Sequence, residues 1–223
     1  IWELGMTLLL LIGVFWLART GARLTGAGAG ESRGVVLIDS GHGGSDPGKI
    51  GIHQEKEKDI NLQIANRLKK QLEKNGVQVY MTRETDTDLS DGTGGNSKVQ
   101  DLKRRCELVR ELQPDCVLSI HQNNFTDGRY SGAQVFYAGT EGSAQLAKLV
   151  QEQLVSALNP GSNRKCKKSD GVYLMEHIDC TGVLIECGFL SNVEEEARLS
   201  CGTYQKKLCC VIAATVSQYL SNT

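Results

Sequence analysis

The chain has 223 residues, of which 23% are charged and 40% hydrophobic, and its 25 basic and 26 acidic residues give a formal net charge of −1. This is an ordinary globular composition, and the chain is long enough for one domain with a sizeable core. The balanced charge argues against nucleic acid as a partner, because proteins that bind it usually carry an excess of basic residues.

The N-terminal residues differ from the rest of the chain. The run LGMTLLLLIGVFWLA (4–18) carries no charge, and its length of about fifteen residues lies between a signal-peptide core and a spanning helix. A Gly/Ala-rich stretch follows it. We therefore expect residues 1–18 to be an export signal or membrane anchor, residues 19–33 a flexible linker, and residues 34–223 a folded domain outside the cytoplasm. A buried helix is the alternative for 1–18, but the run is apolar on all faces.

Short β-branched runs and amphipathic stretches alternate through the remaining sequence. Four stretches with an apolar side chain every three or four residues predict helices at 59–75, 101–112, 143–158 and about 204–220, with Asp59 as the first N-cap. The pattern predicts a single α/β domain, a twisted, mostly parallel six-stranded sheet flanked by helices. The six predicted strands are VVLID (35–39), VQVYMT (77–82), CVLSIH (116–121), AQVFYA (133–138), VYLM (172–175) and GVLIEC (182–187).

Side chains that can bind a metal or transfer a proton lie at the ends of three predicted strands. His42 follows the first strand, His121 ends the third, and Glu186 lies near the end of the last. Sites in parallel sheets gather at the carboxyl ends of strands, so these side chains meet if the strands are neighbours. The glycines around His42 allow the backbone positive φ angles and close approach to a ligand. Asp39 could fix the orientation of a histidine ring.

A metal site with two histidine ligands can take a carboxylate as its third ligand. The segment HQEKEKD (53–59) offers Glu55 and Glu57, and the residues alone do not choose between them. Zinc held by two histidines and a glutamate, with one open position, is a catalytic arrangement. Glu186 lies apart from this acidic segment and could move a proton from water to a leaving amine. Its alternative role is that of a capped or salt-bridged acid at a strand end.

The chain resembles the zinc-dependent N-acetylmuramoyl-L-alanine amidases of bacterial cell walls. Four matching pieces occur in order across nearly all of residues 34–220. They are IDSGHGGSDPG (38–48), EKDINLQIANRLKKQLEKNGVQVYMTRETD (57–86), SIHQN (119–123) and IECGFLSN (185–192).

The resemblance implies a role for each matching residue. It implies one Zn²⁺ per chain on His42, Glu57 and His121, with Glu55 as the alternative third ligand. It also implies that Glu186 is the catalytic glutamate. Two further residues, Asp39 and Asn123, are candidates for supporting the ligands or touching the substrate, which would be a peptidoglycan glycan strand with its stem peptide.

The segment TRETDTDLSDGTGGNSKVQDLKRRCELV (82–109) further resembles the germination-specific amidases of endospore formers. This implies removal of stem peptides in the spore cortex, followed by a deacetylase that forms muramic-δ-lactam, and a lipoprotein partner as in some clostridial relatives. Three alternatives stay open: a general wall-remodelling amidase, a metal-free or partner-dependent scaffold that binds peptidoglycan, and a zinc carboxypeptidase. The last would need an anion clamp, for which Arg83 and Arg129 are the candidates.

Overall fold

The computed structural model describes residues 33–92 and 96–223. The predicted hydrophobic segment 1–18, and all but the last residue of the predicted linker 19–33, lie outside this part. Residues 33–223 cluster as one unit. In the described ranges, no helix has both the length and the hydropathy needed to cross a membrane.

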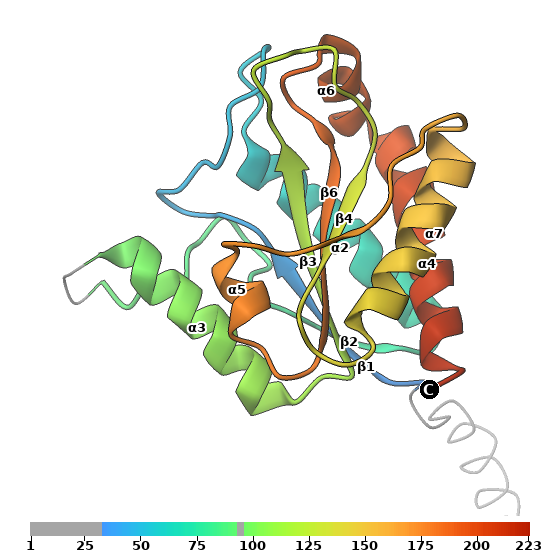
Figure 1. The fold of residues 1–223 in the computed structure, drawn as a ribbon. Helices are drawn as coiled ribbons and strands as arrows, with labels where there is room; N and C mark the ends of the chain where they lie inside the picture. The colour runs from blue at the N-terminus through green and yellow to red at the C-terminus, as the bar shows by residue number, and fades with distance from the viewer. Residues whose placement is uncertain (1–32, 93–95) are drawn as a thin grey trace, which may run out of the picture. The chain divides into compact units, whose positions relative to one another are not determined.

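One six-stranded sheet, in the order β2-β1-β3-β6-β4-β5, forms the centre of the unit (Figure 1). Strands β2, β1, β3 and β6 run parallel, β4 runs antiparallel to β6, and β5 is parallel to β4. The interior strands are buried along most of their length, as expected for parallel strands covered on both faces. The strands are β1 (Val35–Ser40), β2 (Gln78–Met81), β3 (Cys116–Asn123), β4 (Gln134–Tyr137), β5 (Lys167–Lys168) and β6 (Thr181–Phe189).

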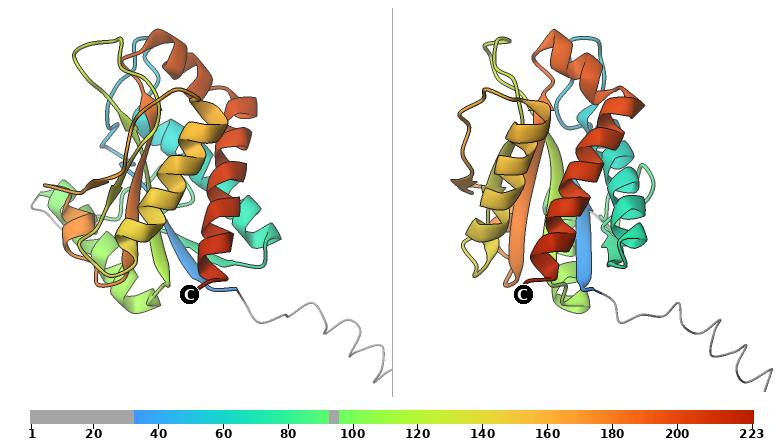
Figure 2. Two further views of the ribbon diagram at one scale, coloured as in Figure 1. Left: turned by 45° about the vertical axis from the view of Figure 1, so that its right-hand side comes forward. Right: turned by 90° about the vertical axis from the view of Figure 1, so that its right-hand side faces the viewer.

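Helices cover both faces of this sheet (Figure 2). The larger core packs α2, α4 and α7 against one face, and a smaller core packs α3 and α5 against the other. This arrangement confirms the predicted α/β class and the mostly parallel sheet. The helices are α2 (Glu57–Lys74), α3 (Ser97–Leu112), α4 (Ser143–Leu158), α5 (Tyr173–Glu176), α6 (Val193–Leu199) and α7 (Gly202–Leu220).

The prediction of a strand at 172–175 is wrong. Tyr173–Glu176 forms the single helical turn α5, and the sixth strand is instead the short β5. A run of four apolar residues has no periodicity that separates strand from helix. Here a helical turn buries Leu174 and Met175 against the smaller core. The helix α6, which is short and acidic, was not predicted at all.

The helix α2 begins at Glu57, earlier than predicted, so Asp59 lies in its first turn and is not the N-cap. The N-cap residue makes no side-chain capping bond. Instead, the backbone N–H of Glu57 donates to the carbonyl oxygen of Lys49. A carbonyl oxygen of the preceding loop therefore accepts a hydrogen bond that a capping side chain would usually accept. The same loop brings the start of α2 against the residues that follow β1.

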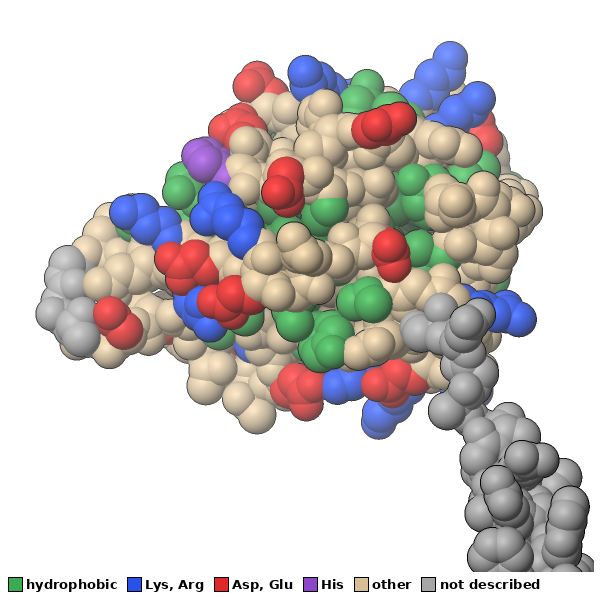
Figure 3. Space-filling view, turned by 90° about the horizontal axis from the view of Figure 1, so that it is seen from below, with side chains coloured by type: hydrophobic (Ala, Val, Ile, Leu, Met, Phe, Trp, Pro, Cys, Tyr) green, Lys and Arg blue, Asp and Glu red, His purple; other side chains and the backbone are tan. Residues whose placement is uncertain are grey.

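Figure 3 shows the end of the molecule at which the parallel strands begin. Acidic and basic side chains are interspersed on this face. The residues predicted to do chemistry lie at the opposite end, where the parallel strands terminate.

Candidate active site

Three parallel strands deliver the predicted residues to one edge of the sheet. His121 on β3 pairs directly with Glu186 on β6, and Ser40 at the end of β1 pairs with Ile120. His42 lies in the glycine-rich turn that directly follows β1. The parallel register therefore brings these side chains together across large separations in sequence.

His42, Glu57 and His121 form a group whose ligand atoms all lie within 4.8 Å of one another. Glu57 lies between the histidines: its Oε2 is 3.2 Å from His42 Nε2, and its Oε1 is 2.9 Å from His121 Nδ1. The two rings meet at 77°. Nitrogen and oxygen ligands of a tetrahedral zinc, at about 2.0–2.1 Å from the metal, lie roughly 3.3 Å apart. The donor types thus match a zinc site, and the three residues lie near enough together to share one ion.

The structure places Glu57, and not Glu55, beside the two histidines. Glu57 is buried at the start of α2, whereas Glu55 is exposed in the preceding loop. Burial raises the pKa of Glu57, but hydrogen bonds with His121 and His42 outweigh it and hold that pKa well below its usual range. The carboxylate is therefore ionised and available as a metal ligand.

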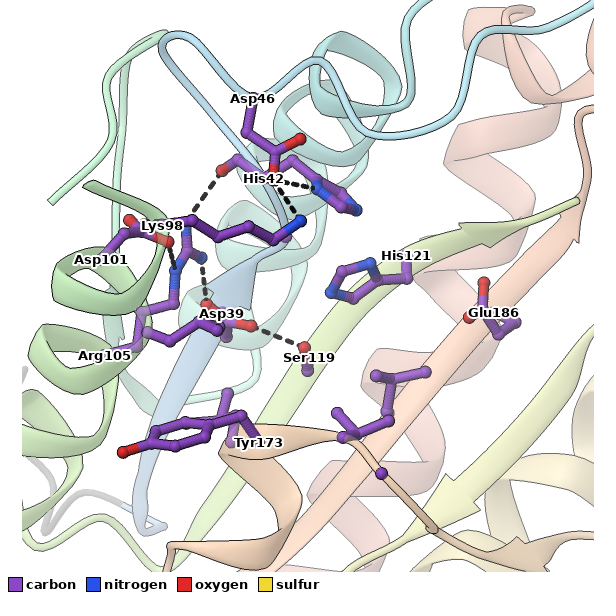
Figure 4. A pocket seen from close by; sticks show the side chains of 16 residues that line it. Asp39, His42, Asp46, Lys98, Asp101, Arg105, Ser119, His121, Tyr173 and Glu186 are labelled. Carbon is purple, nitrogen blue, oxygen red and sulfur yellow. Dashed lines mark hydrogen bonds and ion pairs between the residues drawn. The ribbon is translucent and has the colours of Figure 1, made fainter. Parts of the chain in front are cut away.

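Asp46 orients the His42 ring, a role that the sequence suggested for Asp39. Its Oδ2 lies 2.9 Å from His42 Nδ1 (Figure 4). This contact leaves Nε2 facing Glu57. Burial raises the pKa of Asp46, but the contacts with His42 and Gly48 lower it to about 2. The feature of the sequence that could have identified Asp46 is a carboxylate four residues after His42, within the same glycine-rich turn.

Asp39 supports the turn from behind. Its carboxylate is buried and accepts hydrogen bonds from Arg105, Ser119 and Thr82. Arg105 in turn donates to the carbonyl oxygens of Ser40 and His42, both at 2.9 Å. Asp39 therefore reaches the His42 turn through a buried arginine.

Arg83 makes the second set of contacts with the same turn. It donates to the carbonyl oxygens of Ser40 and Gly41, each at 3.0 Å. His42 has a φ of 61°, a left-handed conformation that costs a residue with a side chain roughly 1–2 kcal/mol. The two arginines thus hold a conformation that the chain alone disfavours. The sequence suggested Arg83 only as an anion clamp, and no pattern in it pointed to Arg105.

Glu186 faces the group from β6 (Figure 4). Its Oε2 is buried without a hydrogen-bond partner in the described structure. Burial, together with the charge of Glu57, raises the pKa of Glu186 to about 7 despite the opposing histidines. A carboxyl group with this pKa can both accept and release a proton near neutrality. A buried carboxyl oxygen without a hydrogen-bond partner lowers the stability of the fold, and groups of this kind are typical of functional sites.

The remaining predicted residue and the other two histidines lie elsewhere. Asn123 lies beyond His121 on β3, where its carbonyl oxygen accepts a hydrogen bond from Leu190, and it does not line the cavity described next. His53 contacts Glu196 of α6, and His177 stacks on Tyr173.

A cavity of about 330 Å³ opens beside the group, between α3 and α5. One wall is polar and comes largely from α3, while the other is largely apolar and comes from α5 and β6. Figure 4 shows Lys98 crossing near Asp46 and Tyr173 at the far side. The lining residues used below are Asp46, Lys98, Arg105, Val172, Leu174 and Leu184.

The family model for N-acetylmuramoyl-L-alanine amidase (Amidase_3) matches residues 36–218. The germination-specific N-acetylmuramoyl-L-alanine amidase of Bacillus subtilis is 38% identical over 191 residues, covering 84% of this chain and 80% of that protein. AmiC, an N-acetylmuramoyl-L-alanine amidase of Escherichia coli, is 29% identical over 239 residues, and the match covers 87% of this chain and 55% of AmiC.

The solved structures include a similar fold at comparable identity. The CwlD amidase of Clostridioides difficile, in complex with the GerS lipoprotein, superposes with a TM-score of 0.81 at 36% identity, covering 85% of this chain and all of that one. The family match spans most of the sequence, and the curated relatives agree with it. The chain therefore belongs to the N-acetylmuramoyl-L-alanine amidase family.

Proposed function

We propose that this chain is a zinc-dependent amidase that hydrolyses the bond between N-acetylmuramic acid and the L-alanine of the peptidoglycan stem peptide. The observation that carries the proposal is the group His42, Glu57 and His121 with Glu186 facing it. Family membership supports the reaction class, and the donor set of two imidazoles and one carboxylate supports zinc.

Each residue of the site has a defined task in this reaction. His42, Glu57 and His121 hold the metal. When bound, zinc polarises the scissile carbonyl and lowers the pKa of a bound water. Glu186 would take a proton from the attacking water and pass it to the departing nitrogen of L-alanine as the amide bond breaks, a transfer for which a pKa of about 7 is well suited. Asp46 keeps the His42 ring turned toward Glu57.

Product analysis tests the reaction. The purified protein with Zn²⁺ is incubated with peptidoglycan, and the products are analysed by mass spectrometry. An amidase releases intact stem peptides with a free L-alanine amine, whereas a carboxypeptidase releases C-terminal amino acids. Neither arginine considered above is available as the anion clamp that a carboxypeptidase would need, since Arg83 donates to backbone carbonyls and the exposed Arg129 pairs with Asp127.

Two variants assign the metal and the proton transfer. Glu186→Ala should retain zinc but lose activity by about 10²-fold or more, as for a lost general acid–base. His121→Ala should lose zinc as well. Full activity in Glu186→Ala would overturn the assignment, and a folded wild-type protein that binds no zinc would favour a scaffold or a partner-dependent enzyme.

We further propose a role in maturation of the spore cortex. The name of the Bacillus subtilis relative and the lipoprotein bound to the Clostridioides difficile relative support this role. The protein would act outside the cytoplasm, exported or anchored by residues 1–18, with a lipoprotein partner and with a deacetylase acting next to form muramic-δ-lactam. Deletion in the source organism should remove muramic-δ-lactam from the cortex. Normal cortex with altered vegetative wall turnover would favour general wall remodelling.

A further inference from the structure

The cavity beside the proposed zinc site extends from His42 and His121 to α5. Pockets of about 300–1,000 Å³ enclose small ligands. A cavity of about 330 Å³ therefore suits a short stretch of peptide, whereas a glycan strand must leave the protein at both ends. This inference rests on the proposed function, which places the bond to be cleaved at the triad.

The two walls of the cavity differ in chemistry. Val172, Leu174 and Leu184 supply aliphatic surface, which matches the methyl group of alanine. The opposite wall carries two cations, Lys98 and Arg105, next to the carboxylates of Asp39, Asp46 and Asp101. A residue that follows alanine in the peptide would therefore meet a wall that can recognise charge.

Arg105 has no capacity left for a ligand. Its three guanidinium nitrogens are bound to Asp101, to Asp39 with Ser40, and to His42. Its charge is matched by the two buried aspartates. It therefore belongs to the support of the His42 turn.

Lys98, unlike Arg105, has a weak contact that a ligand could replace. Its side chain is 64% exposed, and its only charged contact among the described residues is with Asp46 Oδ2 at 3.4 Å. Asp46 is already bound more closely to His42 Nδ1 and to the backbone N–H of Gly48. Exposed ion pairs contribute only about 0–1 kcal/mol, so an incoming carboxylate can take up this ammonium at little cost.

We propose that the cavity is a subsite for the stem peptide and that Lys98 binds a carboxylate on the residue that follows L-alanine. An extended residue spans about 3.3–3.6 Å, which keeps that carboxylate within about 7 Å of the scissile nitrogen. Lys98 reaches this zone, since its ammonium contacts the aspartate that holds His42.

A matched pair of substrates tests the subsite. With the γ-carboxyl of the second residue blocked as its methylamide in both compounds, muramoyl-L-alanyl-D-glutamate carries the α-carboxylate, and muramoyl-L-alanyl-D-isoglutamine replaces it with a neutral carboxamide. With zinc-loaded protein we expect a KM about two- to fivefold lower for the carboxylate substrate, with kcat unchanged. This preference should shrink as salt is raised, because Lys98 is exposed.

Variants of Lys98 locate the preference. Lys98→Ala should remove it, and Lys98→Glu should reverse it. Lys103→Ala is the matched control, since Lys103 lies on the same helix but does not line this cavity, and it should behave as wild type. Equal KM values in the wild type, or a preference that survives in Lys98→Ala, would overturn the subsite.

Calorimetry of the two product dipeptides separates this proposal from the proposed function. Tighter binding of the carboxylate dipeptide that depends on Lys98 supports the subsite even if neither muramoyl substrate is cleaved. Absence of cleavage would count against the amidase reaction alone. Cleavage of both substrates with equal dipeptide binding would retain the amidase and remove the subsite.

Discussion

Arg105 Nη2 donates a hydrogen bond of 2.9 Å to the carbonyl oxygen of His42, so the backbone of one proposed zinc ligand is held by a buried guanidinium. The same group donates to Ser40 O and pairs with Asp39. Because His42 has a positive φ, the planar fork of the Arg105 guanidinium holds a backbone conformation that would otherwise relax.

Arg105→Lys keeps the charge but removes the planar fork, and a lysine cannot reach all of these acceptors. We expect zinc affinity to fall by about tenfold or more, measured by competition with a chromogenic chelator. Arg104→Lys is the control, because Arg104 is a partly exposed neighbour that pairs with Glu107 and Glu111. Thermal unfolding establishes that both variants are folded. Unchanged zinc affinity in folded Arg105→Lys would show that the fork is dispensable for the ligand.

Asp46→Asn should weaken zinc binding by about 10- to 100-fold, the range seen when a partner that orients a metal-binding histidine is lost. The substitution preserves shape but removes the charge that lies 2.9 Å from His42 Nδ1. Zinc titration of the variant gives the measurement. Asp127→Asn, which alters only an exposed pair with Arg129, should leave the affinity at the wild-type value.

The stability of the metal-free protein should depend on pH through Glu186. Its pKa is about 7 in the folded protein against an ordinary value of 4.5, so between these values the folded state binds more protons than the unfolded state. The free energy of unfolding therefore falls as pH rises from about 4.5 to 7.

Glu186→Gln removes this titration. The metal-free variant should gain up to roughly 3 kcal/mol over the wild type at pH 8 relative to pH 4.5, measured by urea unfolding. Glu141→Gln, at an exposed position, should show no such difference between the two pH values. A gain of equal size at both pH values would mean that the Glu186 carboxyl does not titrate in this range.

Gly41→Ala should displace His121. A Cβ at this position would lie 2.2 Å from Cε1 and Nε2 of the His121 ring, closer than atoms can approach. Either the ring or the turn must move, so zinc affinity and activity should fall together by about tenfold or more. Gly139→Ala is the control, because its Cβ would meet its nearest atom at an ordinary 3.7 Å. A variant with normal zinc content would contradict the packing.

Local patterns in the sequence were sufficient for much of the fold. The apolar repeats of α2, α4 and α7 and the β-branched runs of β1, β3 and β6 predicted the α/β class, because each pattern records which side of one element is buried. The run Val172–Met175 failed, since four apolar residues fit a strand and a helical turn equally well. The helices α2 and α3 begin earlier than predicted, because a loop carbonyl and the Asn96 side chain accept hydrogen bonds from their first backbone N–H groups.

By itself, the sequence determined that His42, His121 and Glu186 stand at strand ends and that a carboxylate is available nearby. Only the tertiary structure decided that Glu57 rather than Glu55 lies between the histidines. It also decided that Asp46, and not Asp39, contacts the His42 ring, because this short-range contact depends on how the glycine-rich turn folds. The physical reason is distance along the chain: periodicity reports neighbours a few residues apart, whereas Arg105 meets His42, and Glu57 meets His121, across more than sixty residues. Such pairings exist only once the parallel strands are aligned.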